Sequence, residues 1–128
     1  MDYLKRKRAA GKIEALGPIA ELTDDTIDET HRVVGMMGVE PFQQAIRDGA
    51  QVVLAGRATD ASIYSAIPLM KGYDPGLCWH LSKIIECAGQ VTTPRPGQDC
   101  VLGTIRDDHF LVEPGHPDKR YTRMRIAA

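Results

Sequence analysis

Cysteine and aromatic residues are scarce in this chain of 128 residues, which has three cysteines and 5% aromatic residues. No Cys-x-x-Cys pair occurs, and an odd number of cysteines leaves one thiol over in any disulfide scheme, so we expect reduced thiols. Cys78 and Cys87 fall on different turns of one expected helix, which argues against a shared zinc ion. The sequence therefore predicts no metal site and a location in the reducing cytoplasm.

Long apolar runs and an excess of charge are also missing. No run approaches the roughly 20 residues of a membrane-spanning helix, and the basic first residues lack the apolar segment of a signal peptide. The formal net charge is −1, so no overall attraction to nucleic acid or to an anionic membrane is expected. For the basic run at residues 5–8, a solvated helix face is favoured over a nucleic-acid patch. Neither nucleic acid nor a membrane is therefore an expected partner, and a small-molecule substrate is one partner that this composition allows.

The chain contains 43% hydrophobic residues, and helical and extended patterns alternate along it. Thr23 is expected to cap the second helix, whose buried side would take Ile27, Val33 and Val34. Residues 92–98 are rich in proline and glycine and are expected to form a loop. The expected helices are 2–10, 24–38, 40–48, 61–71 and 77–88; the expected strands are 12–16 and 51–55, with a hairpin of 100–105 and 109–112.

This order predicts an α/β fold: a partial layered α/β domain with a mainly parallel sheet and a C-terminal β-hairpin. Residues 1–91 would form part of the α/β core. Residues 92–128 would form a truncated loop and hairpin extension.

The stretch from Asp48 to Ser62 is the most informative part of the chain. Residues 51–55 form a short apolar run between two glycines, which is typical of a central strand buried on both faces. Ligands in open α/β sheets bind beyond the carboxyl ends of strands, where helix N-termini favour anions. The sequence therefore predicts a concave site directly after this strand.

Arg57, Thr59 and Asp60 are the expected substrate-binding residues of that site. Arg57 suits a carboxylate or phosphate and Asp60 a hydroxyl group, but the two side chains are equally suited to pairing with each other across the turn. For Thr59, capping of the following helix is the favoured role. The sequence assigns no cofactor.

Four residues are weak candidates for catalysis: Glu40, Asp60, Asp108 and His109. Glu40 would need burial to act as a general base, and an ordinary acid in the first turn of a helix is the favoured reading. Asp108 and His109 suit an acid/base pair or a metal, yet a solvated turn is favoured. Cys87 would act as a nucleophile only with a depressed pKa, and an inert thiol is favoured.

Several segments carry a family resemblance: YLKRKRAAGKIEALGP, ELTDDTID, VVGMMGVEPFQQAIRDGAQVVLAGRATDASIYSAIPLMKG, LCWHLSKIIECAG and IRDDHFLVEP. Together they resemble the acyclic terpene utilisation (AtuA-type) family over nearly the whole chain. The resemblance implies a bacterial catabolic protein that acts on a small branched acid or its acyl-CoA ester, without pointing to a particular reaction. It also implies that the chain corresponds to an internal fragment of a longer protein, which forms homo-oligomers or contacts other pathway proteins. A noncatalytic scaffold or assembly segment is the alternative.

Overall fold

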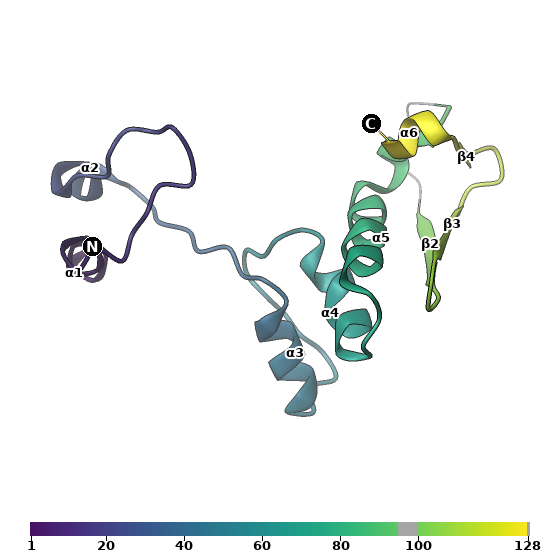
Figure 1. The fold of residues 1–128 in the computed structure, drawn as a ribbon, viewed down its shortest axis with the longest axis horizontal. Coiled ribbons are helices and arrows are strands. Elements are labelled where there is room, and N and C mark those ends of the chain that lie inside the picture. The colour runs from purple at the N-terminus through teal and green to yellow at the C-terminus, as the bar shows by residue number, and fades with distance from the viewer. Residues whose placement is uncertain (95–99, 128) are drawn as a thin grey trace. The chain divides into compact units, whose positions relative to one another are not determined.

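The computed structural model describes residues 1–94 and 100–127. The chain divides into two compact units, Met1–Val34 and Gly35–Ala128, and each is described here by itself. Figure 1 shows their elements in chain order. None of the helices within the described ranges has the length and apolar character needed to cross a membrane.

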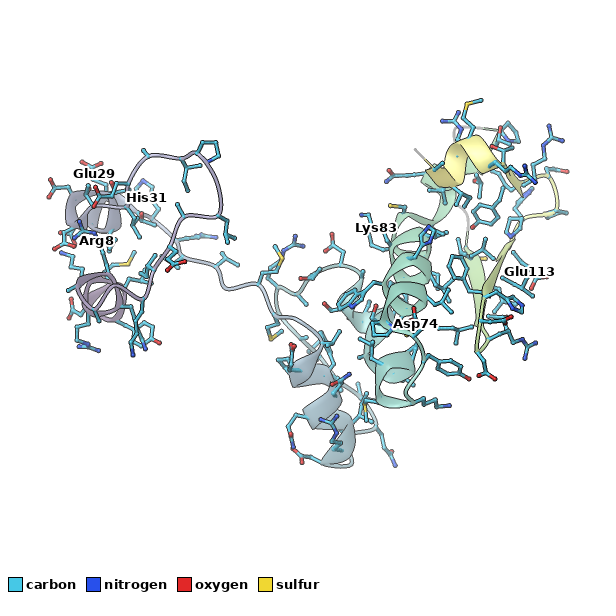
Figure 2. The ribbon with its side chains drawn as sticks, in the orientation of Figure 1. Arg8, Glu29, His31, Asp74, Lys83 and Glu113 are labelled. Atoms are coloured by element: carbon cyan, nitrogen blue, oxygen red, sulfur yellow. The ribbon has the colours of Figure 1, made fainter. Side chains whose placement is uncertain are left out.

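The first unit consists of two short helices, α1 (Asp2–Ala9) and α2 (Asp24–Glu29). Lys5 donates to Asp28 over 2.6 Å, and Arg8 donates to Asp24 over 3.1 Å. Figure 2 shows Arg8 between the two helices. Acids of α2 thus partly neutralise the basic run at residues 5–8.

Two expectations for this unit are wrong. Residues 12–16 form no strand, and Val33 and Val34 are exposed, so that Ile27 alone is buried on α2. The second helix ends at Glu29, well before Gly38, because Thr30 turns to an extended backbone conformation. The valines beyond that point therefore cannot continue its buried side.

The predicted cap of α2 is confirmed, because the Thr26 backbone N–H donates to Thr23 Oγ1 over 3.1 Å. Replacing Thr23 by Ala removes this acceptor and should cost α2 about 1 kcal/mol. We expect faster hydrogen exchange of the Thr26 amide in Thr23→Ala, whereas Thr23→Ser should keep its protection. Equal exchange in the two variants would show that the cap contributes nothing.

The second unit holds three longer helices, two small sheets and short C-terminal elements. Pro41 and Pro75 lie in first turns, where a missing N–H costs nothing, and Asp74 caps α5 by accepting from the Leu77 N–H over 3.0 Å. The elements are α3 (Glu40–Arg47), α4 (Ser62–Met70), α5 (Pro75–Cys87), the 3₁₀ helix η1 (Ala88–Val91), β1 (Thr92–Thr93), β2 (Val101–Ile105), β3 (Phe110–Pro114), β4 (Arg120–Tyr121) and α6 (Arg123–Ala127).

Packing within this unit runs from α3 to α4, from α4 to α5, and from α5 to the hairpin. Val39, Phe42 and Ala66 form the apolar contact between α3 and α4. Between α4 and α5 the contact is polar, because Ser65 and Ser82 are both buried and their hydroxyls are 2.7 Å apart. Each of these two hydroxyls thereby has a partner, which offsets the cost of burying it.

The hairpin is the one part of the predicted sheet structure that is confirmed. Strands β2 and β3 pair antiparallel, from Val101 opposite Pro114 to Ile105 opposite Phe110. The ring of Phe110 meets the His80 ring of α5 edge-on, with centroids 5.1 Å apart. Of the expected loop at 92–98, residues 92–93 form β1, which pairs with β4, and residues 95–99 lie outside the described residues.

The predicted α/β fold with a mainly parallel sheet is wrong. The described residues form six α-helices and two antiparallel sheets of two strands each. Residues 51–55 form no strand and have no ladder partner, and Val52 and Leu54 are 86% and 99% exposed. An apolar run is buried only when neighbouring strands and helices cover it, and nothing in the described part of this unit does so. The division into 1–91 and 92–128 stays a prediction.

Candidate functional site

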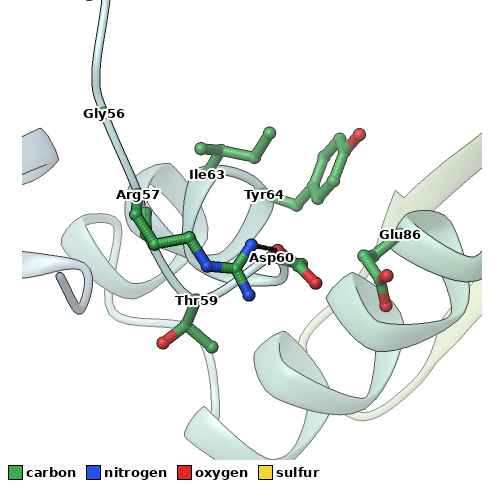
Figure 3. A pocket seen from close by; sticks show the side chains of 8 residues that line it. Gly56, Arg57, Thr59, Asp60, Ile63, Tyr64 and Glu86 are labelled. Carbon is green, nitrogen blue, oxygen red and sulfur yellow. Dashed lines mark hydrogen bonds and ion pairs between the residues drawn. The ribbon is translucent and has the colours of Figure 1, made fainter. Parts of the chain in front are cut away.

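A hollow of about 340 Å³ lies beside the segment that precedes α4. It combines one cation, two carboxylates, a phenol and an aliphatic side chain. Figure 3 shows the side chains that line it, from this segment, from α4 and from α5. The lining residues are Gly56, Arg57, Ala58, Thr59, Asp60, Ile63, Tyr64 and Glu86.

Backbone hydrogen bonds hold this segment on both sides. Met37 donates its N–H to the Arg57 carbonyl over 3.2 Å and accepts from the Thr59 N–H over 2.9 Å, which forms a single parallel bridge. The Ser62 N–H then donates to the Thr59 carbonyl over 2.8 Å at the start of α4. The three predicted substrate-binding residues are therefore presented from one anchored turn, although no strand precedes it.

Arg57 and Asp60 face each other across this turn. Arg57 Nη1 lies 2.9 Å from Asp60 Oδ1, and each side chain is about half exposed, at 51% and 50%. The sequence left open whether these residues pair or bind a ligand. Pairing is the observed state, and a role in ligand binding stays a prediction.

The expected capping role of Thr59 is wrong. The helix α4 begins at Ser62 with Ala61 in the capping position, and no side chain accepts a hydrogen bond there. Thr59 contributes its carbonyl oxygen to this turn, and its side chain lines the hollow. The capping rule failed because Asp60 and Ala61 add a turn between Thr59 and the helix.

Sequence reasoning missed Ile63, Tyr64 and Glu86 as lining residues. Tyr64 follows Asp60 by four residues, a spacing that places side chains on one face at a helix start, and this signal was present in the sequence. Glu86 carries no such signal, because it comes from α5 and reaches the hollow only through the packing of α4 on α5.

Glu86 is held by two neighbours on its own helix. Lys83 Nζ lies 2.5 Å from Glu86 Oε2, and the Cys87 thiol donates to the same oxygen over 3.4 Å. The hydrogen bond from Lys83 lowers the pKa of the Glu86 carboxyl more than burial raises it, and the weaker hydrogen bond from Cys87 adds to the lowering. Glu86 is therefore ionised at neutral pH. Cys87 donates to a carboxylate here, which is an unsuitable setting for a nucleophile.

The other catalytic candidates do not line the hollow. Glu40 is exposed at the first residue of α3, and its carboxylate turns back over Gly38. His109 Nδ1 lies 2.6 Å from Asp108 Oδ1 at the exposed hairpin turn, and this hydrogen bond lowers the pKa of Asp108. A catalytic role for Glu40, Asp108 or His109 stays a prediction. No group of three His, Cys, Asp or Glu residues that suits a metal ion occurs within residues 1–94 and 100–127.

The arrangement has a clear chemical character. Arg57 offers a permanent positive charge with several N–H donors, and the described contacts of its guanidinium use Nη1 alone. Ile63 and Tyr64 expose about half and two fifths of their surface beside it. An anionic group at Arg57 with an apolar body against Ile63 and Tyr64 fits this combination.

Comparison with known proteins gives one match. Residues 1–97 match the family model described as acyclic terpene utilisation family protein AtuA, and this range contains every residue that lines the hollow. No curated protein and no solved structure matches the chain.

Proposed function

The chain belongs to the acyclic terpene utilisation family, and from this premise we propose that it takes part in the bacterial catabolism of acyclic terpenes. Within that role, the hollow beside Arg57 binds a small branched acid or the acyl-CoA ester of one. The proposal includes a cytoplasmic location and a small-molecule substrate, without nucleic acid or a membrane as a partner.

The observation that carries the proposal is the position of Arg57 next to half-exposed apolar side chains. A guanidinium binds a carboxylate with two parallel hydrogen bonds, and it stays protonated at any working pH. Arg57 therefore binds the acid and transfers no proton. Branched alkyl groups of the ligand would cover Ile63 and Tyr64, at about 0.8 kcal/mol for each buried methylene.

Replacing Arg57 by Ala should weaken the binding of 3-methylbutanoate about tenfold. This loss of affinity corresponds to the free energy of roughly one charge-assisted hydrogen bond. Arg57→Lys keeps the charge but loses the planar fork, so we expect an intermediate loss. The measurement is an NMR titration of the chain with the acid. Arg47→Ala is the matched control, because Arg47 is exposed at the end of α3 and lies outside the hollow.

Unchanged affinity in both Arg57 variants would remove Arg57 from the site. Loss of folding in both variants would assign it to the structural pair with Asp60.

A noncatalytic assembly role is the second candidate, and the exposure of Val52 and Leu54 favours it. Large exposed apolar side chains on a segment without a strand partner are typical of surfaces that contact another chain. In that role the chain forms a homo-oligomer or contacts other proteins of the pathway. This candidate becomes the better one if carboxylates bind independently of Arg57 or do not bind.

A further inference from the structure

We propose that Glu86 is a second recognition residue of the hollow, which accepts a hydrogen bond from a hydroxyl group of the ligand. The preferred ligand is then a branched hydroxy acid with a free carboxylate. This inference rests on the proposed function above, because it takes Arg57 as the partner of the ligand's carboxylate.

The first support is position. Glu86 and Arg57 both line the hollow but come from separate elements, α5 and the segment before α4. In the view of Figure 3, the Asp60 side chain lies between Arg57 and Glu86. Because both side chains line the same hollow, we expect a ligand with a polar group at each end of a branched skeleton to contact both residues.

The second support is the state of the Glu86 carboxylate. Its side chain is 23% exposed, against 50% for Asp60, so Glu86 is the less hydrated of the two acids. Both of its contacts with described residues fall on Oε2, which leaves Oε1 as an acceptor. A carboxylate that is partly withdrawn from water discriminates more strongly between ligands with and without a hydrogen-bond donor.

The third support is charge, and it selects a hydroxyl over an amine. The ammonium of Lys83 already neutralises Glu86 at 2.5 Å. A second ammonium on the ligand would be repelled by Lys83, whereas a neutral hydroxyl donates to the carboxylate without this repulsion. The hydrogen bond from Lys83 also keeps the pKa of Glu86 below its ordinary value, so the acceptor persists in mildly acidic solution.

Three acids that differ at one carbon test the inference: 3-methylbutanoate, 3-hydroxy-3-methylbutanoate and 3-amino-3-methylbutanoate. We expect this chain to bind the hydroxy acid about tenfold more tightly than the other two, as one hydrogen bond to a charged group allows. Glu86→Leu should remove the preference while changing the affinity for 3-methylbutanoate less than twofold. Glu86→Gln keeps an amide oxygen and should retain part of the preference. Glu113→Gln, on the exposed hairpin, is the matched control.

The outcomes separate this inference from the proposed function. If none of the three acids binds the unaltered chain, the proposed function fails. If all three bind through Arg57 with equal affinity, or if Glu86→Leu keeps the preference, the role of Glu86 alone is overturned. Tighter binding of the amino acid would also overturn the hydroxyl assignment. Circular dichroism checks the folding of each variant, and if Glu86→Leu does not fold, an undiminished preference in Glu86→Gln overturns the inference.

Discussion

Leu81→Ala should lower the free energy of unfolding by about 2–5 kcal/mol, the usual cost of removing a buried leucine side chain. Leu81 is 5% exposed on α5, where it packs among buried residues and against the hairpin at Gly103. The lost methyl groups leave a cavity that the helix cannot close. Because small domains have only about 5–15 kcal/mol of stability in total, we expect urea unfolding at a much lower midpoint.

Leu54→Ala is the matched control for this experiment, since it makes the same chemical change at a leucine that is 99% exposed. We expect its unfolding midpoint to stay within error of the unaltered chain. The pair of variants also tests the correction to the fold. If Leu54→Ala costs as much as Leu81→Ala, the segment 51–55 is buried in solution and the predicted central strand is restored.

Gly103→Ala should cost about 1–3 kcal/mol, because it adds a methyl group to a space that is already filled. A Cβ at this position would lie 2.6 Å from Ile85 Cδ1 and 2.9 Å from Leu81 Cδ1. Strand β2 can therefore approach α5 only with glycine here, or after both side chains have moved. We expect reduced stability in urea and weaker hydrogen-exchange protection along the hairpin.

Gly35→Ala is the control for Gly103→Ala, because a Cβ there meets no atom within 4 Å. It should be neutral or slightly stabilising, since alanine restricts the unfolded chain more than glycine does. A neutral Gly103→Ala would mean that Leu81 and Ile85 repack freely and that the hairpin does not need a glycine to lie on α5.

Local chemistry explains which elements the sequence predicts correctly. Thr23 starts α2 because its side-chain oxygen accepts a free backbone N–H three residues later. The corresponding cap of α5 by Asp74 was not predicted, and the expected start of that helix at residue 77 came two residues late. Pro41 suits a first turn because its fixed φ is helical and its missing N–H would be unpaired in any case. The hairpin follows from two short apolar runs separated by polar turn residues. These signals act within a few residues and need no tertiary contact.

The residues of the candidate site also fall into two groups, those that local sequence predicts and those that only tertiary packing brings in. Arg57, Thr59 and Asp60 were predictable as a group, because polar residues between an apolar run and a helix are close in sequence as well as in space. The role of Thr59 was predicted wrongly, because the sequence around it does not tell that α4 starts only at Ser62. Glu86 was not predictable as a lining residue, because 26 positions separate it from Asp60 and only the packing of α4 on α5 brings them to one hollow.

The sequence by itself determined the family, the starts of α2 and α3 and the hairpin, because each depends on residue types in a fixed local order. Only the tertiary structure decided whether the apolar run at 51–55 is a buried strand, whether Arg57 pairs with Asp60, and which acid lies across from them. Burial and ion pairing depend on what other segments supply at that point in space. Periodicity along the chain shows which side chains can be covered, and it does not show what covers them.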